Sequence, residues 1–147
     1  MIIRASTATD PVVAADPAAV LAVALTSGLD AAAADSDSAA DFLTACVDAV
    51  AAEFADSCFT AGCPVVPISI ERSARSSELS DAGKDFFRAW RGSVARHLAA
   101  HGIDSPRADR VATLAVSAIK GALVIGRTVQ TVDALLAVRE ELRLLVL

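Results

Sequence analysis

Two histidines, His97 and His101, are one helical turn apart at i and i+4. At this spacing two imidazoles on a helix can bind one metal ion. A zinc site of this kind needs a third ligand nearby and, in the common helical motif, a glutamate between the histidines, and neither is present. We therefore predict no metal and no cofactor, while a helical metal-binding or enzymatic bundle that combines the pair with Cys63 stays open as an alternative.

Cysteines are the other reactive side chains of the sequence. Cys46, Cys58 and Cys63 are odd in number and form no CxxC pair, which indicates free thiols in a reducing cytoplasm. Cys63 stands between Gly62 and Pro64, where a helix start can lower a thiol pKa, although packing is the commoner role of such a cysteine. Because no nucleophile with a base, no paired carboxylates and no phosphate loop occur at useful spacing, we expect no enzyme.

Charge is unevenly distributed along the chain. Up to Glu71 the only basic residue is Arg4, against ten acids, which gives −9, and the remainder has twelve basic and eight acidic residues, which gives +4. The front half would repel a phosphate backbone. A basic stripe in the second half is interpreted as a solvated helix face, because no aromatic residues are interleaved with it. Its members are Lys84, Arg88, Arg91 and Arg96.

The elements that position these groups are predicted to be helices. Hydrophobic residues make up 54% of the chain, mostly Ala, Val and Leu, while Gly and Pro are few and Tyr is absent. This composition favours an all-α fold over a sheet. A length of 147 residues suits one domain. We expect an irregular tail over residues 1–15 and one domain over residues 16–147, built as a bundle of about six helices.

Capping residues and helix breakers divide this domain. Asp16 and Ser38 are predicted N-caps of the first two helices, and Gly102 is a predicted helix end. Ser105-Pro106 has the pattern of a cap followed by a first-turn proline. The expected helices cover residues 17–33, 38 to a break at 58–64, a short one ending near 75, one between a serine-rich turn at 76–80 and Gly102, 105–127 and 132–147.

Neither export nor membrane insertion is expected. The stretch from Ala18 to Leu25 resembles a weak signal-peptide core, but Asp10 and Asp16 precede it where basic residues belong. The most apolar segment, residues 111–125, is short for a bilayer span and contains a lysine. We therefore expect a cytoplasmic protein without a membrane partner.

The last two predicted helices, residues 105–127 and 132–147, carry apolar residues on more than one face. Such helices need neighbours on several sides, so we expect them to pair with a second copy of the chain in a homodimer. The candidate interface residues are Ala118, Ala122, Ile125, Leu135, Val138, Leu142 and Leu145.

Several motifs follow one another in a familiar order along residues 17–147. They are Gly62-Cys63-Pro64, Glu71, Phe87-Arg88-Ala89-Trp90, and Gly121-Ala122-Leu123-Val124 with Arg127. In this order they resemble the C-terminal domain of TetR-type transcription regulators, in a subgroup similar to the lincomycin- and flavonoid-responsive repressors. The resemblance implies that the last two helices pair with those of a partner in a four-helix bundle. It also implies a pocket for a small lipophilic effector, whose binding would shift the DNA-reading heads apart.

The sequence departs from the family pattern in two ways. Such regulators begin with a basic helix-turn-helix domain, which residues 1–15 cannot hold, so we expect DNA contact only through a helix-turn-helix not present in this chain. Lys120 stands where the subgroup commonly has an acid before Gly-Ala. Either Lys120 reaches a carboxylate or phosphate of the effector, or it extends to the surface or pairs with an acid.

Candidate pocket residues combine this resemblance with the helical faces. Trp90, the only tryptophan, either lines an effector pocket or packs in the core, and the phenylalanines have the same two interpretations. The candidates are Phe54, Phe59, Ile68, Phe86, Trp90, Ile119 and Lys120. We predict the ligand-sensing and dimerisation domain of a TetR-type repressor. The alternative is a headless interaction protein that heterodimerises with a full-length regulator.

Overall fold

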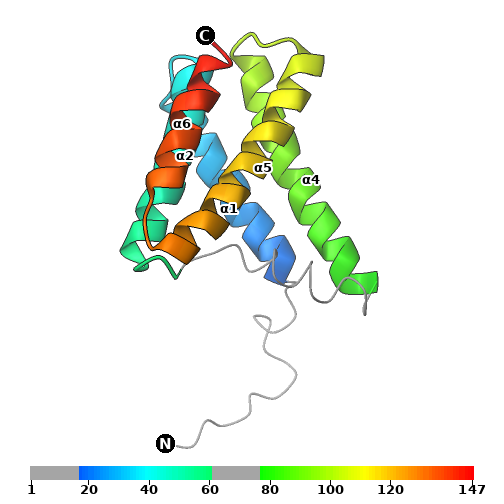
Figure 1. Ribbon diagram of the computed structural model, residues 1–147. Coiled ribbons are helices and arrows are strands. Elements are labelled where there is room, and N and C mark those ends of the chain that lie inside the picture. The colour runs from blue at the N-terminus through cyan, green and yellow to red at the C-terminus, as the bar shows by residue number, and fades with distance from the viewer. Residues whose placement is uncertain (1–16, 61–76) are drawn as a thin grey trace, which may run out of the picture.

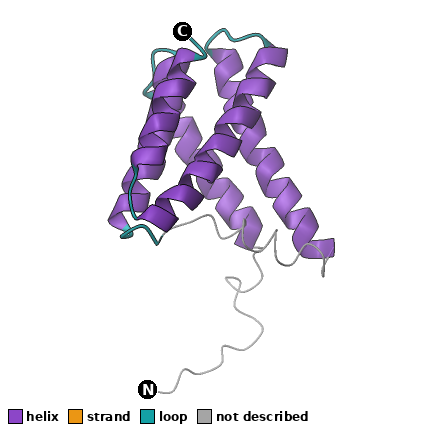
Figure 2. Ribbon diagram, viewed as in Figure 1, coloured by secondary structure: helices purple, strands orange, loops and turns teal. Residues whose placement is uncertain are grey.

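Five α-helices make up the structure, a computed structural model that describes residues 17–60 and 77–147 (Figures 1 and 2). They are α1 (Pro17–Ala34), α2 (Ala39–Asp56), α4 (Ser77–Ala100), α5 (Ser105–Val129) and α6 (Asp133–Leu144). The described ranges contain no strand, which confirms the all-α prediction. The tail predicted over residues 1–15, the cap at Asp16 and the short helix ending near residue 75 lie outside the described residues.

Two of the main helix contacts, α2 with α6 and α1 with α4, join helices that are not consecutive in the chain. In Figure 1, α2 runs beside α6, and α5 crosses obliquely between these two helices and α4. The first helix, α1, packs mainly against α4, and α5 contacts both α4 and α6. All five helices contribute to one apolar core. Its largest fully buried side chains are Phe42, Phe54, Leu43, Leu98, Leu135 and Val47, each worth roughly 1.5–3 kcal/mol of transfer free energy.

Side-chain caps fix where the helices start and end. The amide of Asp41 donates to Ser38 Oγ over 3.1 Å, which confirms Ser38 as the N-cap of α2. Gly102 has a φ of +90°, a conformation suited to glycine, and confirms the predicted end of α4. The predicted cap of α5 is wrong by one residue. Asp104 accepts from the amide of Arg107 over 3.1 Å, so Ser105 is already the first helical residue.

The start of α4 and the end of α6 differ from the prediction. We predicted a turn over residues 76–80, but α4 begins at Ser77. Serine and acidic residues are favoured both in turns and in the first turn of a helix, so composition alone does not separate the two. Asp81 and Lys84, 2.9 Å apart at i and i+3, then support the helix. At the other end α6 stops at Leu144, three residues before the predicted end at residue 147.

Helix α5 is the central helix of the bundle, and it is both long and apolar. By length and composition its 25 residues could cross a membrane. The apolar segment that the sequence analysis considered, residues 111–125, was shorter than this helix. In this structure eight of its residues are buried in the bundle. The opposite face leaves large apolar side chains in solvent, and these are Leu114, Val124, Ile125 and Val129.

Candidate ligand pocket

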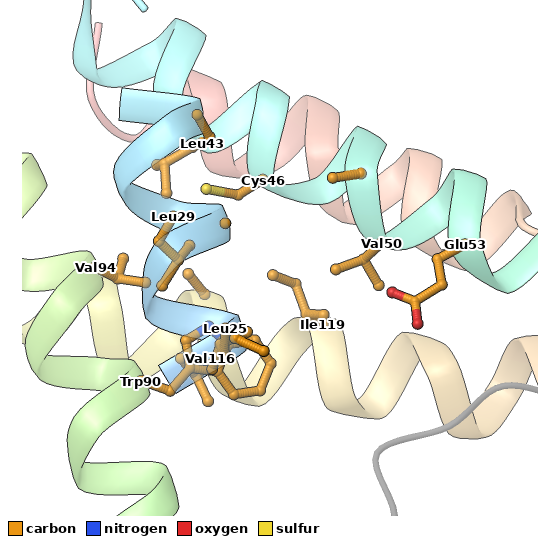
Figure 3. A pocket seen from close by; sticks show the side chains of 15 residues that line it. Leu25, Leu29, Leu43, Cys46, Val50, Glu53, Trp90, Val94, Val116 and Ile119 are labelled. Atoms are coloured by element: carbon orange, nitrogen blue, oxygen red, sulfur yellow. The ribbon is translucent and has the colours of Figure 1, made fainter. Parts of the chain in front are cut away.

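A cavity of about 330 Å³ lies among α1, α2, α4 and α5 (Figure 3). Helix α1 contributes Ala24, Leu25, Gly28, Leu29 and Ala32. Helix α2 contributes Leu43, Cys46, Ala49, Val50 and Glu53. The remaining wall consists of Trp90 and Val94 from α4 with Ala115, Val116 and Ile119 from α5.

The cavity exists because several of the wall residues are small. On α1, Ala24, Gly28 and Ala32 recur at i, i+4 and i+8, so one face of this helix carries almost no side-chain volume. A Cβ built on Gly28 would meet no atom within 4 Å. Space is therefore available beside the backbone of α1, and it faces the larger side chains of the other helices.

On α2 the pocket residues follow one helical face. Leu43, Cys46, Val50 and Glu53 recur at i, i+3, i+7 and i+10. The first three are apolar or only weakly polar, and Glu53 brings a carboxylate to the solvent-exposed end of the series. The same helix therefore supplies both apolar wall and charge.

Trp90 forms the aromatic part of the wall. Only 5% of this residue is exposed, and its ring lies 6.1 Å from the ring of Phe86 between centroids. The ammonium of Lys120 sits over the Trp90 ring, 4.4 Å from its centroid, in a cation–π contact. The half-buried Lys120 therefore lies against the tryptophan, and it is not among the residues that line the cavity.

Among the residues that the structure describes, two polar side chains line the cavity, the thiol of Cys46 and the carboxylate of Glu53. Burial raises the pKa of the Cys46 thiol to about 12. The thiol therefore stays protonated near neutral pH and offers neither a nucleophile nor a charge. This leaves Glu53 as the charged group among the described residues of the wall.

Only some of the predicted pocket residues line the cavity. Trp90 and Ile119 line the cavity. Phe54 and Phe86 are buried in the core without lining it. Half-buried Phe59 packs edge-on against Phe54, with 5.4 Å between ring centroids. Ile68 lies outside the described residues.

The predicted interface residues differ in how far they are exposed to solvent. Ala122, Leu135 and Leu142 are buried in the core of the chain itself, because α6 packs along α2 with the face that carries both leucines. These three residues are not accessible to a second copy. Ala118 and Val138 are half-buried. Exposed residues from the predicted set are Ile125, at 55% exposure, and Leu145, at 37%.

The sequence analysis missed the contribution of α1 and the pocket residues Cys46 and Glu53. The helical periodicity of α2 could have identified Cys46 and Glu53, since they share a face with Leu43 and Val50. For α1 the sequence pattern indicated only weakly which face lines the pocket. Its wall is formed largely by alanine and glycine, and such residues do not mark one helical face as apolar.

The two histidines are occupied by other contacts. His97 Nε2 lies 2.7 Å from Asp30 Oδ1, and Arg96 Nη2 lies 2.8 Å from the same oxygen, so α4 is tied to α1. Both imidazoles also stack near the ring of Phe42. Within residues 17–60 and 77–147 no group of three or more possible metal ligands occurs. All four members of the basic stripe are exposed, and two of them, Lys84 and Arg88, form ion pairs along α4.

The fold and site define an all-helical bundle domain that encloses an apolar cavity of ligand size. Residues 39–141 match the family model described as "Transcriptional regulator LmrA/YxaF-like, C-terminal domain". This chain belongs to that family of TetR-type regulator C-terminal domains, as the resemblance in the sequence indicated.

Two curated relatives carry the name "Uncharacterized HTH-type transcriptional regulator" and come from Mycobacterium tuberculosis, strains CDC 1551 / Oshkosh and ATCC 25618 / H37Rv. Each is 30% identical over 113 residues, which cover 73% of this chain and 58% of the relative. The match thus spans little more than half the length of these relatives.

Proposed function

We propose that this chain is the effector-sensing and dimerisation domain of a TetR-type transcriptional repressor that acts in the cytoplasm and has no catalytic role. The cavity carries the proposal. Its volume of about 330 Å³ is at the lower end of the usual range for small-molecule sites, and its wall is apolar apart from the thiol and carboxylate described above. A small lipophilic molecule fits such a site.

The position of α1 supports a sensing role. This helix forms one wall of the cavity and is held to α4 through the contacts of Asp30 with Arg96 and His97. A ligand that binds one arrangement of α1 and α4 better than another shifts the population towards that arrangement. We infer that this shift controls DNA binding through a helix-turn-helix unit, because the relatives are named HTH-type transcriptional regulators.

The exposed face of α5 supports dimerisation. Leu114, Ala118, Gly121, Ile125 and Val129 recur at i, i+4, i+7, i+11 and i+15, so they form one stripe, here named the α5 stripe. Leu144, Leu145 and Leu147 are also exposed at the end of the chain. Gly121 and Ala118 would allow a second helix to approach closely. We propose that α5 and α6 of two copies pair through this surface in a four-helix bundle.

Fluorescence of Trp90 tests the effector site. The chain has one tryptophan and no tyrosine, so its emission reports on this wall of the cavity. Titration with 4-phenylbutanol, a neutral apolar probe, should change the emission in a saturable way. Gly28→Leu should abolish the change, because the added side chain occupies the cavity beside α1.

Gly92→Leu is the matched control for this experiment. Gly92 is also a helical glycine whose Cβ would meet no atom within 4 Å, but it is exposed on α4 and does not line the cavity. Its variant should respond to the probe as the unaltered chain does. No saturable response in the unaltered chain, or an undiminished one in Gly28→Leu, would contradict the proposed function.

A further inference from the structure

We infer that the effector is an amphipathic amine, with an apolar body held in the cavity and a protonated nitrogen beside Glu53. The inference rests on the proposed function, since it concerns the same cavity, and it adds the chemical class of the ligand. It follows from three observations, namely the polar groups of the wall, the charge of the helices that form the wall, and the position of Lys120.

The described part of the wall has one charged group, and it lies at one end. Among the described lining residues Glu53 alone carries a charge, because the Cys46 thiol is neutral. In Figure 3 the Glu53 carboxylate projects from α2 on the side of Val50 and Ile119 remote from Trp90. The cavity therefore has an aromatic, apolar end and an acidic end. A matching ligand has an apolar body and, at the opposite end, a cation that can donate a hydrogen bond to a carboxylate.

The surrounding charge favours the same sign of ligand. Residues 17–60, which include α1 and α2, contain seven Asp and Glu residues and no Lys or Arg. These two helices supply ten of the fifteen lining residues. Asp30 and Asp48 form ion pairs with Arg96 and Arg139. The other five acids, Glu53 included, form no ion pair with another helix within the described part of the chain. A negative potential over this wall attracts cations and repels anions.

Lys120 determines which end the ligand nitrogen occupies. Its ammonium already covers the Trp90 ring at 4.4 Å from the centroid. A second cation at that ring would be repelled by Lys120, whereas the carboxylate of Glu53 attracts it. The apolar body therefore packs at the Trp90 end and the nitrogen lies at the Glu53 end. Lys120 does not line the cavity, so it makes no direct contact with a ligand there and acts on it only through its field.

Three probes of nearly the same shape test this inference. They are 4-phenylbutylamine, 4-phenylbutanol and 4-phenylbutyrate, which present a cation, a neutral hydroxyl and an anion on the same apolar body. Because Glu53 is exposed, we expect a modest preference, with the amine binding about three- to fivefold more tightly than the alcohol and the carboxylate more weakly than both. The preference should shrink as salt is added. Binding is followed by Trp90 fluorescence and checked by calorimetry.

Two variants distinguish contact with Glu53 from the general field. Glu53→Gln should make the amine and the alcohol bind equally well. Asp56→Asn removes the same charge from an exposed position on the same helix that does not line the cavity, and it should keep the preference. An equal loss in both variants would overturn the contact with Glu53.

The possible failures are distinguishable. If the alcohol binds and the amine binds no better, or the carboxylate binds best, the inference is wrong while the effector site of the proposed function stands. If none of the three probes gives a saturable response that Gly28→Leu removes, the proposed effector site is overturned and the amine class with it.

Discussion

The ring of Phe54 lies so close to Gly126 that a Cβ on this glycine would stand 2.9 Å from Phe54 Cε1. The same atom would stand 2.6 Å from the carbonyl oxygen of Thr131. The amide of Thr131 donates to the Gly126 carbonyl over 3.2 Å, so the turn that follows α5 cannot easily withdraw. Gly126 thus fixes the distance between α2, α5 and the turn leading to α6.

Gly126→Ala is expected to lower the free energy of unfolding by about 1–3 kcal/mol, because the methyl group forces the ring and the turn apart. Gly92→Ala serves as the control, since its Cβ would meet nothing within 4 Å in an exposed helix. It should raise stability by about 0.5–1 kcal/mol through helix propensity. Urea unfolding followed by circular dichroism measures both. A Gly126→Ala variant as stable as the unaltered chain would show that this contact is not tight.

Leu135→Ala is expected to destabilise the folded chain, because Leu135 is 0% exposed and belongs to the core that α2 and α6 share. Removing a fully buried leucine side chain typically costs about 2–5 kcal/mol. Thermal unfolding at low protein concentration, where association contributes least, measures the loss. A loss that disappears on dilution would instead place Leu135 between two copies.

Gly121→Glu tests the proposed dimer. A carboxylate on the α5 stripe would be buried without a partner between two helices, so sedimentation equilibrium should report monomers. The fold should persist, because a Cβ at Gly121 meets no atom within 4 Å in the single chain. Gly92→Glu introduces the same side chain on α4 and should leave the dimer unchanged. The dimer proposal fails if the unaltered chain is itself monomeric at high concentration.

Thiol labelling tests the burial of Cys46. Since burial raises the pKa of this thiol to about 12, the folded chain holds almost no Cys46 thiolate at about pH 8. Cys58 is exposed and free. A Cys58→Ser/Cys63→Ser variant should therefore react with a thiol reagent much more slowly than a Cys46→Ser/Cys63→Ser variant, and at the same rate once unfolded in urea. Comparable rates in the folded state would mean that Cys46 is accessible.

The helices were predictable where a local signal fixes them. The cap at Ser38 and the end at Gly102 need only nearby residues. The start of α4 was missed because its first residues suit a turn and a helix equally. Whether an apolar face meets its own chain or a second copy is a property of the tertiary packing. Periodicity therefore identified Leu135 and Leu142 as apolar-face residues, but it could not show that both are buried within their own chain.

The cavity was harder to predict than the core around it. Sequence reasoning looked for large aromatic residues, and Trp90 does line the cavity, but most of the phenylalanines pack elsewhere. The space itself arises from small residues such as Gly28 and Ala32, and which of them face each other depends on how α1 packs. Glu53 was overlooked because an exposed acid on a helix is usually only solvated.

The pairing of α2 with α6 affects how the protein is made. Because α2 packs chiefly against α6, most of its contact surface has no permanent cover until the ribosome has made α6. Until then the part of α2 that packs against α6 stays in contact with water or with helper proteins, whereas Phe42 already lies against His97 and His101 at the end of α4. Of the described helices, the one that completes the core is therefore made last, and a chain that lacked it would expose apolar side chains of α2.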